Sequence, residues 1–183
     1  MPRIRSLRPN VSREEATEQF TNGLAGALHA TLRGPIRSVA DFYIPFVLFQ
    51  VTINNAGTQD TCIFGVDSVS GLLDPYQFEK IPDASQLISV DTRNYPQPLL
   101  DSDGARELLA NKVRRLLFQK GFFRMRDLKI ELSPLAADLC VPYWVGFRGR
   151  GGRAYLSVLD AVRRKSEGAK VRELLENWLT RPG

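Results

Sequence analysis

The chain has 183 residues, of which 43% are hydrophobic and 25% are charged. This composition is typical of a globular protein that folds without disulfides or metals. A single histidine excludes a cluster of histidine ligands and any mechanism that needs two histidines. The formal net charge of +5 is a modest surplus that by itself favours no class of partner.

Charge is distributed unevenly along the chain. Residues 1–40 carry six basic and three acidic side chains, residues 41–103 carry two and nine, and residues 104–183 carry seventeen and eight. The basic C-terminal half can attract an acidic partner. The oppositely charged parts can equally attract each other within one fold. We favour this second interpretation because mixed surfaces are common.

The N-terminal sequence MPRIRSLRPN contains three arginines but no apolar segment, which a secretory signal requires. The longest apolar run, Phe42 to Phe49, is far shorter than the roughly 20 residues that span a bilayer. The sequence therefore predicts a cytoplasmic protein that does not interact with a membrane.

The first predicted element is a helix. Ser12 and Glu15 have the spacing of a capping box, in which each side chain accepts a hydrogen bond from the other residue's backbone N–H. Apolar residues follow at the spacing of one buried helix face, and Gly34-Pro35 predicts the end of the helix. The predicted buried face contains Phe20, Leu24, Ala27, Leu28, Thr31 and Leu32.

A β-hairpin is predicted next. Residues 42–53 and 61–69 are apolar, β-rich runs, and the Asn-Asn-Ala-Gly sequence at 54–57 is typical of the turn between two strands. Asp74-Pro75 then predicts a short helix over 75–80. The following stretch, 83–102, has little periodicity, and we interpret it as a connection.

The second half of the chain has the same predicted order. A helix is predicted over 105–120 with Asp103 as its cap, and a short strand over 128–132. The strands of a second hairpin are predicted at 139–147 and 154–159. A final helix is predicted after Ser166-Glu167. Its buried face contains Val171, Leu174, Leu175, Trp178 and Leu179.

The two hairpins correspond in sequence. Asp41 precedes Pro45 by the same spacing as Asp138 precedes Pro142, and the closing strands end in Val66-Asp67 and Leu159-Asp160. The sequence thus predicts one α+β domain over 1–183. In this fold, two pseudo-repeated helix–β-hairpin units form an antiparallel sheet with helices packed on one face. The copies cover about 11–82 and 103–183, joined by the connection 83–102. Chance similarity of two β-rich runs is the alternative.

The sequence Val66-Asp67-Ser68-Val69-Ser70-Gly71 resembles the V-D-A-x-T-G end of hairpins in PepSY-like domains. The second copy, Leu159 to Arg164, lacks the glycine. The resemblance implies repeated helix-plus-hairpin units and a binding or regulatory module without catalytic residues. PepSY-like domains are typically extracytoplasmic modulators of peptidases, whereas this sequence has no recognisable export signal.

Few single residues suggest chemistry. His29 is interpreted as a surface or half-buried helix residue, and no nucleophile-elbow motif supports the alternative of a Ser-His-Asp site. Cys62 and Cys140 are interpreted as buried thiols, with a disulfide between the hairpins as the alternative. Asp67 and Asp160 are expected to accept hydrogen bonds from nearby backbone N–H groups. Alternatively, they share a proton or hold a cation.

The sequence Arg148-Gly-Arg150-Gly-Gly-Arg153 is the candidate binding site. Together with Tyr143 and Tyr155, it offers arginines that pair with phosphate and aromatic rings that stack on bases. Glycines and aromatic residues are equally what a hairpin turn and its strands require, and we favour this second interpretation.

No catalytic, metal-binding or cofactor-binding residue is predicted. The sequence favours a non-enzymatic binding or regulatory module for a protein or small ligand. The alternative is a nucleic-acid-binding protein that uses the basic C-terminal half, and an enzyme is the least favoured class.

Overall fold

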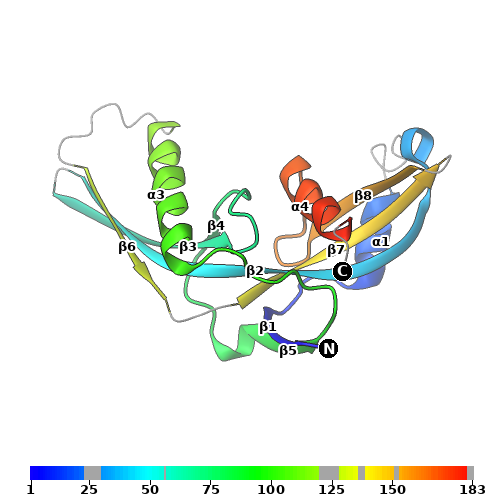
Figure 1. Cartoon of the computed structure of the whole chain (residues 1–183), viewed down its shortest axis with the longest axis horizontal. Coiled ribbons are helices and arrows are strands. Elements are labelled where there is room, and N and C mark those ends of the chain that lie inside the picture. Colours follow the sequence, from blue (N-terminus) through cyan, green and yellow to red (C-terminus); the bar gives the residue numbers. More distant parts are fainter. Residues whose placement is uncertain (23–29, 56, 120–127, 136–138, 151–152, 181–183) are drawn as a thin grey trace. The chain divides into compact units, whose positions relative to one another are not determined.

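The computed structural model describes residues 1–22, 30–55, 57–119, 128–135, 139–150 and 153–180. The chain divides into two compact units, which interleave in sequence (Figure 1). Unit 1 consists of Met1–Ile44, Leu87–Pro96 and Cys140–Gly183, and unit 2 consists of Pro45–Gln86 and Gln97–Leu139. Strand β2, Ile36–Asn55, belongs partly to each unit.

The predicted fold class is wrong. The described strands form one nine-stranded sheet in the order β4-β3-β2-β7-β1-β5, with β6, β8 and β9 off this path, rather than two helix–hairpin repeats. The sheet is mixed, because β1 pairs parallel with β7. The error has a physical cause: β2 is 20 residues long and hydrogen-bonds to β3, β6 and β7. One strand therefore serves both units, which two self-contained copies do not allow.

Unit 2 is an antiparallel sheet in the order β6-β2-β3-β4, with a helix packed against it (Figure 1). Its elements besides β2 are β3 (Thr58–Asp67), β4 (Tyr76–Phe78), the 3-10 turn η1 (Ala84–Gln86), α3 (Ser102–Gln119) and β6 (Lys129–Pro134). The predicted first hairpin is confirmed, since β2 and β3 pair from Phe46↔Asp67 to Asn55↔Thr58. The core lies between the sheet and α3 and contains Phe49, Val51, Phe64, Val66, Ala105, Leu109, Val113 and Leu117.

Unit 1 contains the second predicted hairpin and the two terminal parts of the chain. Its elements are β1 (Arg3–Leu7), α1 (Arg13–Thr21), the first part of β2, β5 (Leu87–Asp91), β7 (Leu139–Arg150), β8 (Arg153–Asp160), β9 (Lys165–Ser166) and α4 (Ala169–Leu179). The capping box of Ser12 and Glu15 is confirmed at the start of α1. Packed against this helix are Val39, Leu159 and the half-buried Trp144.

Helix α4 packs against β8. As predicted, Val171, Leu174 and Leu175 are buried. Trp178 is half-buried and meets Phe42 edge to face, with the ring centroids 4.9 Å apart. Leu179 is 46% exposed, so the buried face of this helix ends earlier than the pattern predicts.

Several local predictions are wrong. The segment predicted as a helix over 75–80 contains strand β4, and the predicted connection 83–102 contains η1 and β5. Helix α3 begins at Ser102, before the predicted cap Asp103. Leu32 is 64% exposed rather than part of a buried face. The predicted positions of Leu24, Ala27, Leu28 and His29 lie outside the described residues.

The ends of the two hairpins share a local geometry. The backbone N–H that follows each strand-end aspartate donates to a proline carbonyl, Ser68 to Pro45 at 2.9 Å and Ala161 to Pro142 at 3.0 Å. Four residues after each aspartate the backbone has a positive φ, 67° at Gly71 and 58° at Arg164. A short strand follows each hairpin and pairs antiparallel with its closing strand, β4 with β3 and β9 with β8.

In the part of the chain that the structure describes, no helix combines the length and the apolar character needed to cross a membrane.

Candidate functional site

Arg148 lies near the end of β7 and points into unit 1, where it is 2% exposed. Its Nε donates to Ser157 Oγ at 3.0 Å, and its two terminal nitrogens donate to the carbonyls of Gly34, at 3.2 Å, and Phe20. Burial, followed by the positive charge of Arg33, lowers the pKa of this guanidinium. Arg148 therefore ties the last turn of α1 to the hairpin and offers no surface to a ligand.

The other residues of the predicted binding site have different environments. Tyr143 is 3% exposed and belongs to the core. Tyr155 is half-buried, and the guanidinium carbon of Arg33 lies 5.9 Å from its ring centroid. Arg150 and Arg153 pair with each other across β7 and β8, so their backbones lie side by side, while their side chains are outside the described part of the structure.

Two arginines that the sequence analysis did not single out lie beside this hairpin end. Arg33 stacks on Tyr155, and Arg37, in β2, donates from a terminal nitrogen to the carbonyl of Gly149 at 3.5 Å. A Cβ at Gly149 would lie 3.0 Å from Nε of Arg37, so the glycine leaves room for that side chain. We call Arg33, Arg37 and the paired hairpin positions Arg148–Arg150 and Arg153 the arginine end.

Arg33 and Arg37 lie on opposite faces of the β7–β8 hairpin. Side chains alternate between the two faces of a strand, and directly paired residues share a face. Tyr155 is paired with Arg148, so Arg33, which stacks on Tyr155, lies on the Arg148 face. Gly149 is the next residue in the strand, so Arg37, at the Cβ position of Gly149, lies on the other face.

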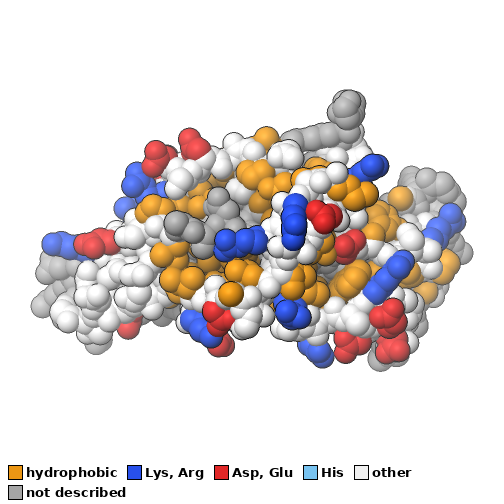
Figure 2. Space-filling model, turned by 90° about the horizontal axis from the view of Figure 1, so that it is seen from below, with side chains coloured by type: hydrophobic (Ala, Val, Ile, Leu, Met, Phe, Trp, Pro, Cys, Tyr) orange, Lys and Arg blue, Asp and Glu red, His pale blue; other side chains and the backbone are white. Residues whose placement is uncertain are grey.

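Among the described residues, no carboxylate forms an ion pair with Arg33, Arg37 or Arg148. The described ion pairs join Lys80 to Asp83, Arg106 to Asp103 and Arg164 to Glu15, none of which belongs to this end. On the face of the molecule shown in Figure 2, basic, acidic and hydrophobic side chains are interspersed.

Asp67 organises a loop of unit 2. It is 1% exposed, and its Oδ1 accepts hydrogen bonds from the N–H of Ser70 at 2.7 Å, Ser70 Oγ at 3.0 Å and the N–H of Gly71 at 2.9 Å. Oδ2 accepts from the N–H of Leu73 at 2.9 Å. Lys112 Nζ, from α3, donates to the carbonyls of Gly71 and Leu73. The expected structural role of Asp67 is confirmed, since both carboxylate oxygens hold the loop.

Asp160 has a similar role in unit 1. It is fully buried, and its Oδ1 accepts from the N–H groups of Val162 and Arg163, both at 2.8 Å. Burial, followed by the negative charge of Asp160, raises the pKa of the half-buried Glu167. Glu167 therefore holds its proton up to a higher pH than an exposed glutamate does. Across the described residues, no group of three or more potential metal ligands forms.

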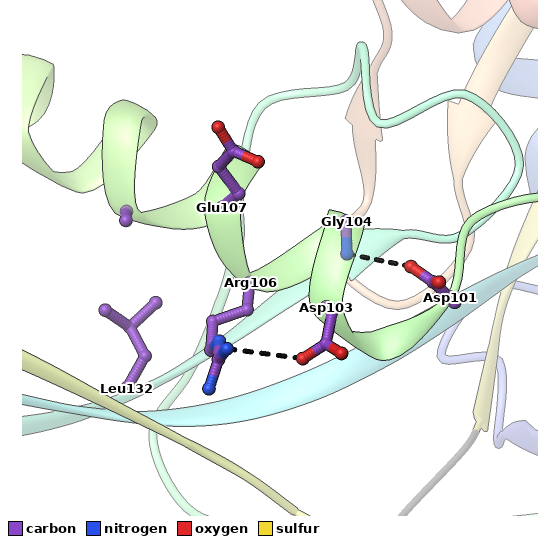
Figure 3. A pocket seen from close by; sticks show the side chains of 7 residues that line it. Asp101, Asp103, Gly104, Arg106, Glu107 and Leu132 are labelled. Atoms are coloured by element: carbon purple, nitrogen blue, oxygen red, sulfur yellow. Dashed lines mark hydrogen bonds and ion pairs between the residues drawn. The ribbon is translucent and has the colours of Figure 1, made fainter.

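An open groove of about 610 Å³ lies in unit 2 at the start of α3 (Figure 3). It is lined by Asp101, Asp103, Gly104, Arg106, Glu107, Ala110 and Leu132. Asp101 Oδ1 accepts from the N–H of Gly104 at 2.8 Å, and Asp103 pairs with Arg106 at 3.3 Å. Glu107 points away from this pair (Figure 3). Both aspartates thus stabilise the first turn of α3, and the groove brings together no nucleophile and base.

Cys140 is buried and Cys62 is half-buried, and the alternative of a disulfide between them is not realised. No protein-family model, no curated protein and no solved structure matches the chain. The resemblance to PepSY-like domains therefore stays a prediction.

Proposed function

We propose that the chain is a non-enzymatic binding module that takes an anionic partner at the arginine end. The observation that carries this proposal is the placement of Arg33 and Arg37 on opposite faces of one hairpin, with no described carboxylate paired to either. A surface of one sign raises the local concentration of oppositely charged partners and speeds their association.

The side chains are held in a way that suits binding. The guanidinium of Arg33 lies over the ring of Tyr155. Arg37 lies over Gly149, and a side chain at that position would come into close contact with it. On the same face as Arg33, the buried Arg148 ties the hairpin to α1. Arginines whose rotamers are already restricted lose less entropy when they bind, so this arrangement favours affinity.

Three of the described aspartates have structural roles. Asp67 and Asp160 accept hydrogen bonds from the loops that follow their strands, and Asp101 accepts one from the start of α3. A general acid or base must exchange its proton with a substrate. These three side chains instead stabilise local backbone, so none of them is a candidate for that role.

The proposal is tested with two chemically different polyanions, heparin and polyglutamate, whose binding to the full chain is measured by fluorescence anisotropy. The double variant R33A/R37A should bind both at least about tenfold more weakly, because it removes the exposed Arg37 and the half-buried Arg33, the two arginines of this end whose side chains are described and not fully buried. The matched control is R114A/R115A, which removes two exposed arginines from α3 in unit 2. Equal losses in the two double variants would show that the arginine end is not the binding surface.

A further inference from the structure

We infer that the anionic partner of the arginine end is the phosphate backbone of double-stranded nucleic acid, bound through charge and not through stacked bases. This inference rests on the proposed function and names the ligand class of the same site. Three observations lead to it: the scarcity of exposed apolar residues, the environment of the aromatic rings and the placement of the arginines.

The apolar surface of unit 1 does not suit an acidic protein partner. Protein interfaces have an apolar, often aromatic core surrounded by polar residues. Among the described residues of unit 1, the large hydrophobic side chains that are strongly exposed are Met1, Leu32 and Leu179. Only Leu32 neighbours the arginine end in sequence. Interfaces with nucleic acid are more polar and much more positive, as this end is.

The aromatic rings are not available to single-stranded bases. Proteins that bind single strands stack successive bases on exposed aromatic side chains. Here Tyr143 is 3% exposed, the ring of Tyr155 carries Arg33, and Phe147 is half-buried. Trp144 is half-buried and donates from Nε1 to the carbonyl of Val11 at 2.9 Å. Because no described aromatic ring of this hairpin is fully exposed, we expect the site to depend mainly on charge, which a duplex carries at the higher density, about one charge per 1.7 Å of its axis.

The placement of the arginines fits two rows of phosphates. Arg33 and Arg37 lie on opposite faces of the hairpin, so they point to different sides of its end. The two strands of a duplex border each groove with a row of phosphates on either side. Guanidinium groups on both faces of a hairpin can therefore contact both backbones.

The test uses the full chain and three labelled probes: a random-sequence DNA duplex of about 20 base pairs, one of its single strands, and polyglutamate. Binding is measured by anisotropy between about 50 and 200 mM salt. The duplex should bind more tightly than the single strand. R33A/R37A should weaken duplex binding at least about tenfold and reduce the slope of log K against log salt by about two, since two phosphate contacts are lost. R114A/R115A should retain most of the wild-type affinity and slope.

The outcomes separate this inference from the proposed function. Tighter binding of the single strand, or an unchanged salt slope in R33A/R37A, would overturn the duplex assignment. Polyglutamate binding that R33A/R37A abolishes, without duplex binding, would also overturn it but would support an anionic partner at this end. Failure to bind any polyanion would overturn both. Matching circular-dichroism melting curves for the wild type and both variants establish that a loss of affinity is not a loss of folding.

Discussion

At the level of single residues, Arg148 shows why a sequence motif can mislead about exposure. Its neighbours in the sequence are glycines and arginines, which suggest a solvated turn, yet its side chain is 2% exposed. The acceptors that stabilise it are two carbonyls and a hydroxyl from distant parts of unit 1. One of these carbonyls, that of Phe20, lies in the last turn of α1, where the helix dipole favours a cation. None of these acceptors can be recognised from the motif itself.

Arg148→Ala should therefore destabilise the protein by about 3 kcal/mol or more, because it leaves three acceptors without their buried donor and removes packed atoms. Urea unfolding followed by tryptophan fluorescence measures this loss. Arg37→Ala is the matched control: its side chain is exposed, so its free energy of unfolding should stay within about 0.5 kcal/mol of wild type. Similar stabilities for the two variants would contradict the structural role of Arg148.

Glu167 should make the stability depend on pH. Burial and the nearby charge of Asp160 raise its pKa above the ordinary value of 4.5. The folded state therefore holds the proton more tightly than the unfolded state. The stabilisation is complete below the ordinary pKa and is lost as pH rises through the raised one. Glu167→Gln does not titrate, so its free energy of unfolding should decline less than that of wild type between about pH 4 and pH 7.

The measurement is a series of urea unfolding curves over that pH range for wild type, Glu167→Gln and Glu173→Gln. Glu173 is an exposed residue of α4 and serves as the control. If Glu173→Gln flattens the pH dependence as much as Glu167→Gln does, the environment of Glu167 is not the cause.

At the level of elements, the turns after β3 and β8 differ at the position with positive φ. Gly71 occupies it in unit 2 and Arg164 in unit 1. An added Cβ at Gly71 would clash with Leu108 and lie 2.9 Å from Cδ1 of Leu100. Gly71→Ala should therefore destabilise the protein by about 2–3 kcal/mol, because it adds backbone strain to overpacking.

Arg164 tests the backbone strain alone. Both Arg164→Gly and Arg164→Ala remove the hydrogen bond to the carbonyl of Asn10 and the exposed pair with Glu15. Only the glycine variant relieves the positive φ, so it should be more stable than the alanine variant by about 1 kcal/mol. Thermal denaturation of the two variants measures the difference, and equal stabilities would show that the turn relaxes at no cost.

The features that the sequence predicted correctly are those that depend on residues close together in the chain. The capping box, the hairpin turn predicted at 54–57 and the apolar face of α4 depend on residues close in sequence. The capping box is present, β2 and β3 pair up to Asn55↔Thr58, and the first part of the apolar face of α4 is buried. Strands β4 and β9 were missed because they are only three and two residues long. Strands β1 and β5 were missed because each depends on a distant partner: β1 pairs with β5 from Arg3↔Asp91 to Leu7↔Leu87, eighty or more residues away in the chain. In Arg3–Leu7, alternation of exposed arginines with Ile4 was the available signal.

The sequence motif at Arg148–Arg153 indicates that this hairpin end is basic. It does not show that Arg148 is buried, or that Arg33 and Arg37, which lie on either side of Gly34-Pro35 in the sequence, lie beside the hairpin. Only the pairing of β2 with β7 brings these segments together. Such pairing between distant strands cannot be read from periodicity, which reports the environment of each segment alone.

At the level of the whole molecule, the units are interleaved rather than consecutive. β2 passes from unit 1 into unit 2, the chain returns to unit 1 at Leu87–Pro96, and it returns again at Cys140. The core of unit 2, however, draws all its members from the continuous stretch 45–139. The predicted repeats divide that core: the copy 11–82 contains Phe49 and Phe64 but lacks α3, which covers them.

A fragment of residues 45–139 should therefore fold alone, whereas a fragment of residues 11–82 should not. The first retains β6-β2-β3-β4 and the helix residues Ala105, Leu109, Val113 and Leu117, so its apolar sheet face stays covered. The second exposes that face and lacks β7, the neighbour of the first part of β2. We expect a cooperative thermal transition by circular dichroism and dispersed amide NMR signals from 45–139 only. A cooperative transition in 11–82, or its absence in 45–139, would show that the folding units follow the repeats of the sequence rather than the cores of the structure.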